Sequence, residues 1–268
     1  MLTFVPTPIG NLEDISFRAL EALKRADVIL AEDTRVIKKL LSLLSQKYGI
    51  DFGQKRIFSL HEHNQEEFLQ KIDPTIFEDD VVYVSDAGMP GISDPGAALV
   101  RYVKEHGIDY TVLPGPSAFS VAWVASGYEG SFCFYGFLPH KKGRKEMLQK
   151  ILRNTDHSIL YEAPHRLLKL LEEIATFDPE RRLFLGKELT KKFESYYEGS
   201  SQELLDRLKK EQIKGEWVVI ITPAKEIGLK IDFAPLLELD MPKKELAKLI
   251  SKLTGESVGS IYEKLIKS

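Results

Sequence analysis

Charged side chains that could move a proton gather in two short segments of this sequence. AEDTR carries Glu32, Asp33 and Arg35, and SLHEHN carries His61 and His63. A carboxylate or an imidazole in a loop can take a proton from a weakly acidic hydroxyl group, and an arginine can stabilise the charge that develops. The residue types therefore indicate acid–base chemistry, with Glu32 or His61 as the group that helps to remove the proton.

The same side chains also have structural interpretations. Asp33 and Arg35 could pair only to brace their loop. His61 and His63 alternate along what we expect to be an extended segment, so both rings would face the same side. That geometry could hold a metal ion, but no third ligand follows nearby in the sequence, and we therefore expect no metal site.

Loops rich in glycine and proline suggest that a ligand is bound by the main chain. The stretch VSDAGMPGISDPG, residues 84–96, places three glycines, two prolines and two aspartates directly after an apolar strand. Glycine lets a ligand approach the backbone, whose free N–H and C=O groups then supply hydrogen bonds. Asp86, at the strand end, could accept hydrogen bonds from an amino group or from ribose hydroxyls, or could cap amides of its own loop.

The usual phosphate-binding signatures are missing from the sequence. No G-x-G-x-x-G follows a strand, and no G-x-x-x-x-G-K-[ST] occurs. Such glycine-rich loops hold the phosphates of dinucleotides and nucleoside triphosphates. The remaining loops therefore indicate a small cofactor that is held by backbone groups rather than by a phosphate cradle.

The first 116 residues alternate between apolar strands and helices, which predicts a mostly parallel, doubly wound sheet. Strands are expected at 2–9, 28–33, 56–60, 81–86 and 110–115, and helices at 15–27, 36–47, 65–72 and 97–105. In open sheets of this kind, ligands bind where loops leave the carboxyl ends of the strands. TPIGN, EDTR, SDAGMPGISDPG and PGPSA all follow strands, so we expect them to meet at one edge.

A second α/β series begins with an apolar helix expected at 117–127. Strands of a mixed sheet are expected at 131–137, 158–163, 182–189, 194–199 and 217–222, and helices at 144–154, 167–177 and 202–212. The sequence thus predicts an α/β fold with a first domain at 1–116, a second at 117–224 and a helical extension at 225–268.

The extension is expected to hold two short helices. The first would place Leu246, Leu249, Ile250 and Leu253 on one face and stop at Gly255, and the second would end near Lys267. The pair resembles a helix-turn-helix, but a helical appendage packed on the second domain is favoured over a DNA-binding unit.

Composition excludes several classes of protein. The formal net charge of the 268 residues is −3, and the first 116 hold 12 basic against 18 acidic residues, so a polyanion would meet only local basic patches. Cys133 is the single cysteine, which rules out an intramolecular disulfide. The start MLTFVPTPIG shows no signal peptide, and no run approaches the roughly 18 apolar residues of a membrane span. We therefore expect a cytoplasmic setting.

Eight motifs in order carry a family resemblance. They are VPTPIGNLEDIS, AEDTR, SLHEHN, SDAGMPGISDPG, LPGPSA, FYGFLPHKKGR, YEAPHRL and KELTKKFE. Together they resemble the tetrapyrrole methylase (class III methyltransferase) superfamily, and within it the bacterial branch that methylates the RNA of the small ribosomal subunit. The resemblance runs from Leu2 to about Thr222 and is weaker over the tail.

The resemblance implies a cofactor and a reaction. S-adenosylmethionine would bind in a cleft between the two α/β domains, and its methyl group would pass to the ribose 2′-hydroxyl of a cytidine in the decoding centre of 16S rRNA. It also suggests a homodimer. The implied cofactor residues are Pro8, Ile9, Gly10, Ser85, Asp86, Ala87, Gly88, Pro90, Gly91, Ser117, Ala118, Tyr161, Glu162, Gly215 and Glu216. The catalytic candidates on the acceptor side are Glu32, Asp33, Arg35 and His61.

Short basic segments are the candidates for contact with RNA, although such clusters are often only solvated surface. They supply Arg35, Lys38, Lys141, Lys142, Arg144 and Lys145. Two other functions stay open at this point. One is a methyltransferase of the same fold that acts on a small tetrapyrrole, and the other is a ribosome-binding module without catalysis.

Overall fold

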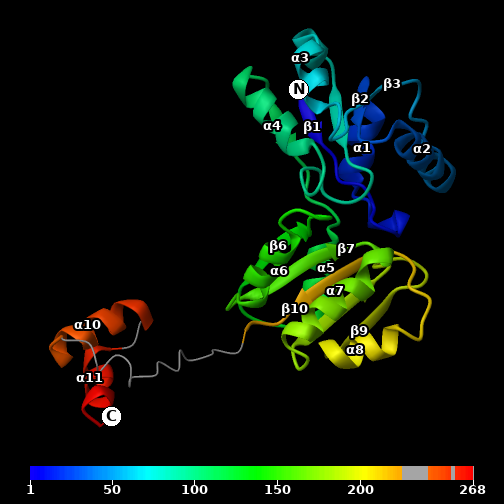
Figure 1. Ribbon diagram of the computed structural model, residues 1–268. Helices are drawn as coiled ribbons and strands as arrows, with labels where there is room; N and C mark the ends of the chain where they lie inside the picture. Colours follow the sequence, from blue (N-terminus) through cyan, green and yellow to red (C-terminus); the bar gives the residue numbers. More distant parts are fainter. Residues whose placement is uncertain (225–240, 255–256, 268) are drawn as a thin grey trace. The chain divides into compact units, whose positions relative to one another are not determined.

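The computed structural model describes residues 1–224, 241–254 and 257–267 of the chain (Figure 1). By contacts, the chain divides into two compact units, Met1–Pro223 and Ala224–Ser268. The domain boundary predicted near residue 116 falls between two separate five-stranded sheets, inside the first of these units. None of the described helices is long and apolar enough to cross a bilayer.

The first sheet is parallel throughout, with strand order β3-β2-β4-β1-β5. Its strands are β1 (Leu2–Phe4), β2 (Val28–Ala31), β3 (Arg56–Ser59), β4 (Val81–Val84) and β5 (Tyr110–Val112). Residues on both faces of β2 and β4 are buried, as expected for strands covered on two sides. The predicted doubly wound sheet is confirmed, and its strands end earlier than predicted because the turns and loops begin there.

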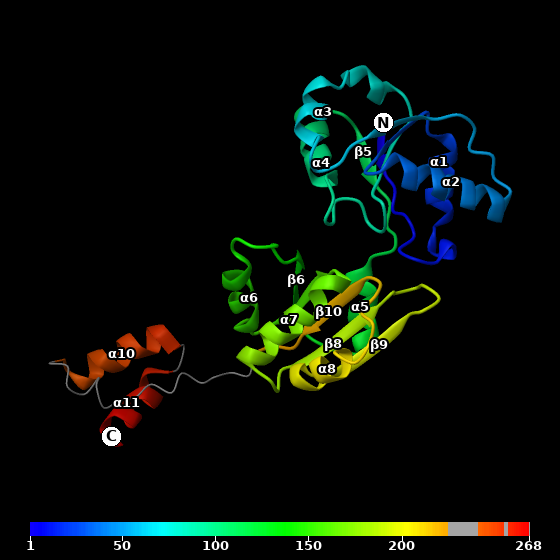
Figure 2. The same cartoon turned by 45° about the vertical axis from the view of Figure 1, so that its right-hand side comes forward.

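Four helices cover this sheet, two on each face (Figure 2). They are α1 (Phe17–Arg25) and α2 (Thr34–Tyr48) on one face, and α3 (Gln65–Lys71) and α4 (Gly96–Glu105) on the other. Two of these helices begin with a side chain that caps the first turn. Ser16 Oγ accepts from Ala19 N at the start of α1, and Asp33 Oδ1 accepts from Arg35 N at the start of α2. Two short 3₁₀ turns, Leu12–Asp14 and Pro74–Glu78, were not predicted.

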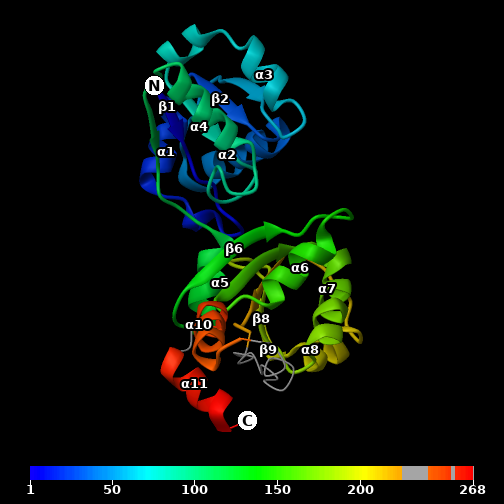
Figure 3. The same cartoon turned by 60° about the vertical axis from the view of Figure 1, so that its left-hand side comes forward.

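The second sheet is mixed, with strand order β6-β7-β10-β8-β9. Its strands are β6 (Phe132–Phe137), β7 (His157–Glu162), β8 (Arg182–Lys187), β9 (Ser195–Ser200) and β10 (Trp217–Ile221). Only β6 and β7 pair in parallel. One face packs on α6 (Arg144–Leu152), α7 (Pro164–Phe177) and α8 (Ser201–Leu208), and the other face on α5 (Ala118–Ser126) (Figure 3).

The second unit contains α10 (Lys243–Thr254) and α11 (Val258–Lys267), drawn in orange and red in Figure 1. Leu246, Ala247, Ile250, Ile261 and Leu265 form its small apolar cluster. The helix that was expected to place Leu246, Leu249 and Ile250 on one face is present, and 47% of Leu249 is exposed. The predicted stop at Gly255, and residues 225–240 of the predicted extension, lie outside the described residues.

Candidate functional site

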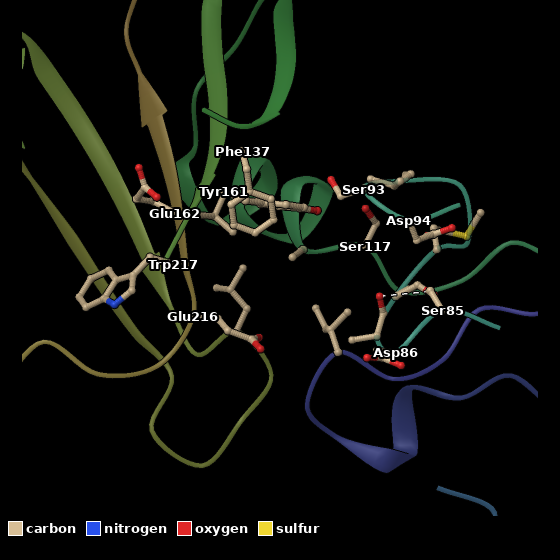
Figure 4. Close-up of a pocket in the computed structure, with 18 of the residues that line it drawn as sticks. Ser85, Asp86, Ser93, Asp94, Ser117, Phe137, Tyr161, Glu162, Glu216 and Trp217 are labelled. Atoms are coloured by element: carbon tan, nitrogen blue, oxygen red, sulfur yellow. Dashed lines mark hydrogen bonds between the residues drawn. The ribbon is translucent and has the colours of Figure 1, made fainter. Parts of the chain in front are cut away.

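A cavity of about 340 Å³ lies where the loops of the first sheet meet the strand ends of the second. Both walls come from the first unit (Figure 4). Among the residues predicted to bind a cofactor, those that line the cavity are Ile9, Ser85, Asp86, Ala87, Gly88, Ser117, Ala118, Tyr161, Glu162 and Glu216. Glu32, predicted to be catalytic, also lines it. The sequence motifs therefore converge on one place in the fold.

The loop at residues 84–96 forms one wall and is held by its own hydrogen bonds. The Asp94 carboxylate accepts from Gly91 N at 2.8 Å, from Gly96 N at 2.7 Å and from the Tyr83 hydroxyl at 2.9 Å. Gly88 and Thr7 exchange two backbone hydrogen bonds of 3.0 Å, which tie the loop to TPIGN. The many turn residues thus build a fixed ledge of main chain beside the cavity.

Glu32 and Asp86 form an acidic corner of this wall. Asp86 N donates to Glu32 Oε2 at 3.4 Å, and Asp33 N donates to Asp86 Oδ1 at 3.0 Å. These bonds cross between the ends of β2 and β4. Burial raises the pKa of both the Glu32 and the Asp86 carboxyl above their ordinary values. Neither side chain forms a salt bridge with a residue that the structure describes.

Asp33 and Arg35 form an ion pair, which was one of the two interpretations that the sequence allowed. Arg35 Nη2 lies 2.6 Å from Asp33 Oδ2, and this hydrogen bond lowers the pKa of Asp33 to about 2. Asp33 also caps α2, while the Arg35 side chain is 88% exposed. Neither residue lines the cavity.

His61 follows the end of β3 and does not line the cavity. The segment was expected to be extended, but His61 to Asn64 forms a turn, in which Asn64 N donates to His61 O at 3.1 Å and Asn64 Oδ1 accepts from His61 N. The ring centroids of His61 and His63 are 6.1 Å apart. Over the described residues, no three His, Cys, Asp or Glu side chains are grouped as metal ligands.

The opposite wall comes from the ends of β6, β7 and β10. Figure 4 shows the Tyr161 hydroxyl directed toward Ser117, whereas the Glu162 carboxylate and the Trp217 ring point away from Asp86. Glu162 Oε1 accepts from Arg166 Nε and from Ala163 N, both at 3.0 Å. Glu162 therefore holds the wall in place rather than presenting its carboxylate to the cavity.

Arg144 was predicted to contact RNA, and the structure contradicts this. The residue is only 5% exposed, its Nη2 lies 2.9 Å from Glu173, and its Nη1 lies 3.5 Å from Glu162. A buried arginine that pairs with two carboxylates is not free to meet a phosphate. The other candidates for RNA contact are exposed, namely Arg35, Lys38, Lys141, Lys142 and Lys145.

Several predicted cofactor residues lie near the cavity but do not line it: Pro8, Gly10, Pro90, Gly91 and Gly215. A Cβ at Gly10 would lie 2.4 Å from Lys191 Cγ, and Asn11 N donates to Thr190 Oγ1 at 3.1 Å. A Cβ at Gly215, whose φ is +79°, would lie 2.5 Å from Glu188 Cγ. These two glycines allow chain segments to approach each other closely.

Met89 also lines the cavity and lies in the loop from Ser85 to Gly91 that the resemblance assigned to the cofactor. Other residues of the wall were not predicted from the sequence: Ile92, Ser93, Asp94, Phe137, Ala163, Pro164, Leu189, Trp217 and Val218. Most lie inside the quoted motifs, so motif membership was the signal that could have found them.

All the charged residues on the wall are acidic, namely Glu32, Asp86, Asp94, Glu162 and Glu216. Arginines neutralise Glu162, and Lys191 pairs with Glu216, which leaves Glu32, Asp86 and Asp94 as the main source of negative potential.

Comparison with known proteins identifies the family. A family model described as "Tetrapyrrole (Corrin/Porphyrin) Methylases" matches residues 1–205. A protein of Campylobacter fetus subsp. fetus named ribosomal RNA small subunit methyltransferase I is 45% identical, over 99% of this chain and 100% of its own length. Proteins of the same name are 40% identical in Escherichia coli O157:H7, over 98% of this chain and 93% of theirs, and in Thermotoga maritima, over 82% and 97%.

Solved structures agree on the fold. Uroporphyrin III C-methyl transferase from Thermus thermophilus has a TM-score of 0.59 and 16% identity, covering 82% of this chain and 96% of that one. A structure of that enzyme with S-adenyl homocysteine has a TM-score of 0.57 and 16% identity, with the same coverage of both chains. At this level of identity the likeness shows the fold alone.

Proposed function

Since the chain belongs to the tetrapyrrole (corrin/porphyrin) methylase family, we propose that it transfers a methyl group from S-adenosylmethionine to ribosomal RNA. The relatives whose names specify the small-subunit RNA support this substrate class. The acceptor is the 2′-hydroxyl of a cytidine ribose in the decoding centre of 16S rRNA, within the small subunit in the cytoplasm. A homodimer fits the exposed apolar surface of α5, where Val124 is 79% exposed.

The observation that carries the proposal is the acidic, main-chain-lined cavity. A sulfonium cofactor is positively charged and supplies an already activated methyl group. The corner formed by Glu32 and Asp86 favours a cation, and the glycine-rich ledge around Gly88 offers backbone groups to its polar parts. Ser117 and Tyr161 would contact it from the other side.

Glu32 is the residue that we propose as the proton acceptor. A ribose hydroxyl is a weak acid, so a base beside it assists its attack. Glu32 lines the cavity and its raised pKa makes it a stronger base than an ordinary carboxylate, whereas His61 and Asp33 do not line the cavity. Arg35, exposed beside this corner, is proposed to attract the RNA backbone together with Lys38 and the lysines of the HKKGRK segment.

The test is methyl transfer with a radiolabelled cofactor. We expect label to enter small subunits from a strain that lacks the modification and not to enter uroporphyrinogen. Label in uroporphyrinogen alone would favour the small-molecule methyltransferase. Calorimetry with S-adenosylmethionine separates both from a non-catalytic ribosome-binding module, which would give no heat of binding.

A further inference from the structure

A β-bulge re-aims one aromatic side chain of β6 onto the cavity face. The pairing of β6 with β7 shifts between Phe134, opposite Ile159, and Gly136, opposite Leu160, so that Phe137 lies opposite Tyr161. In a regular strand, residues three apart point to opposite faces, but the extra residue places Phe137 on the same side as Phe134. Gly136 has a φ of +63°, a conformation that glycine adopts without strain.

The Phe137 ring packs against one aromatic neighbour and is only half covered. It meets the Tyr161 ring edge-on, with centroids 5.5 Å apart and an interplanar angle of 62°. Tyr161 is itself fixed by the Phe134 ring at 4.9 Å and by Phe119 N, which donates to its hydroxyl at 3.3 Å. Phe137 lines the cavity but is 51% exposed (Figure 4). An apolar ring at this place is open to a flat partner from outside.

We propose that Phe137 is the platform on which the base of the acceptor nucleotide stacks when its ribose enters the cavity. The inference rests on the proposed RNA substrate and adds the residue that positions it. Bases that have left their own stack are commonly received on aromatic side chains.

The charge of the cavity supports stacking as the means of holding this nucleotide. Glu32 and Asp86 repel phosphates, so basic side chains can hold the RNA backbone only outside the cavity, and an uncharged contact must fix the nucleotide at its mouth. The cofactor is expected deeper, against Ser85 and Ser117, which are 5% and 8% exposed. The half-exposed ring therefore serves the acceptor and not the cofactor.

The experiment compares Phe137→Leu and Phe137→Tyr with Phe177→Leu as the matched control. Phe177, at the end of α7, is 44% exposed and does not line the cavity. We expect Phe137→Leu to raise the apparent KM for small subunits on the order of tenfold. The Kd for S-adenosylmethionine should stay unchanged, Phe137→Tyr should restore the KM because it keeps a ring, and Phe177→Leu should match the wild type.

Two outcomes would overturn the inference while leaving the proposed function intact. In the first, Phe137→Leu methylates small subunits with the KM of the wild type. In the second, its Kd for S-adenosylmethionine rises by the same factor as the KM, which would mean that the ring stacks on the cofactor. If the wild-type protein itself transfers no methyl group to small subunits, the proposed function fails, and the inference fails with it.

Discussion

Glu32 and Asp33 are neighbours in the chain, yet their carboxyl groups are shifted in opposite directions. Burial beside Asp86 raises the pKa of Glu32, whereas the hydrogen bond from Arg35 lowers the pKa of Asp33 to about 2. One residue therefore faces the cavity as a potential base, and the next caps a helix and stays charged. A difference of one position at the end of β2 separates the residue that we propose as the base from one that caps a helix.

Removing the half-buried charge of Glu32 is expected to stabilise the protein and to slow its reaction. A raised pKa in the folded state contributes stability that is complete below the ordinary value of 4.5 and is lost as pH rises through the raised value. At neutral pH the charged Glu32 carboxylate therefore lowers the stability of the folded state. Glu32→Gln removes the charge and keeps an oxygen that can accept from Asp86 N.

We expect Glu32→Gln to raise the urea midpoint at pH 7, with a gain that shrinks as pH falls toward 4.5. Single-turnover methyl transfer should fall about 100-fold or more. Glu13→Gln is the control, because the pKa of Glu13 is lowered by its hydrogen bond from Lys47 and its neutralisation brings no gain in stability. Unchanged single-turnover transfer in Glu32→Gln would remove this residue from the mechanism.

At the scale of elements, the start of α6 is fastened by a buried ionic network. Arg144 reaches Glu173 on α7 and Glu162 at the end of β7, and Arg166 binds Glu162 from the first turn of α7. Arg166 Nη2 also donates to Leu138 O at 2.6 Å. The network joins two helices to the strand that carries Tyr161, so it positions the wall of the cavity.

We expect Arg144→Ala to lower the free energy of unfolding by about 3 kcal/mol, because Glu173 loses its arginine and the buried Glu162 keeps only Arg166. Lys145→Ala, at the exposed neighbouring position, should change it by less than about 0.5 kcal/mol. Urea denaturation of both variants measures the difference. The opposite result would be an Arg144→Ala variant that is as stable as the wild type but binds RNA more weakly and with less dependence on salt. It would show that Arg144 contacts RNA.

At the scale of the whole molecule, all residues that line the cavity belong to the first compact unit, Met1–Pro223. Segments of this unit that are far apart in the chain contact each other, as in the hydrogen bond that Asn11 N donates to Thr190 Oγ1. The second unit has its own apolar cluster around Leu246 and Ile261. Binding of the cofactor should therefore depend on the first unit alone.

A chain that ends after Ala224 is expected to fold and to bind S-adenosylmethionine with a Kd within about threefold of the full-length value, since none of the cavity wall is removed. Calorimetry gives the Kd, and a thermal melt verifies the fold. A folded truncated chain that gives no heat of binding would show that the cavity needs the second unit.

The sequence by itself determined the order of the elements, the two α/β sheets and the loops that meet at the cavity. These features are set locally, because hydrophobic periodicity and turn residues act over a few neighbouring positions. Only the tertiary structure decided that Arg144 is buried, that Gly10 packs against Lys191 and that a bulge turns Phe137 toward the cavity. Each of these depends on a partner brought close by folding, such as Glu173, 29 residues away from Arg144, and such a contact leaves no local pattern in the chain.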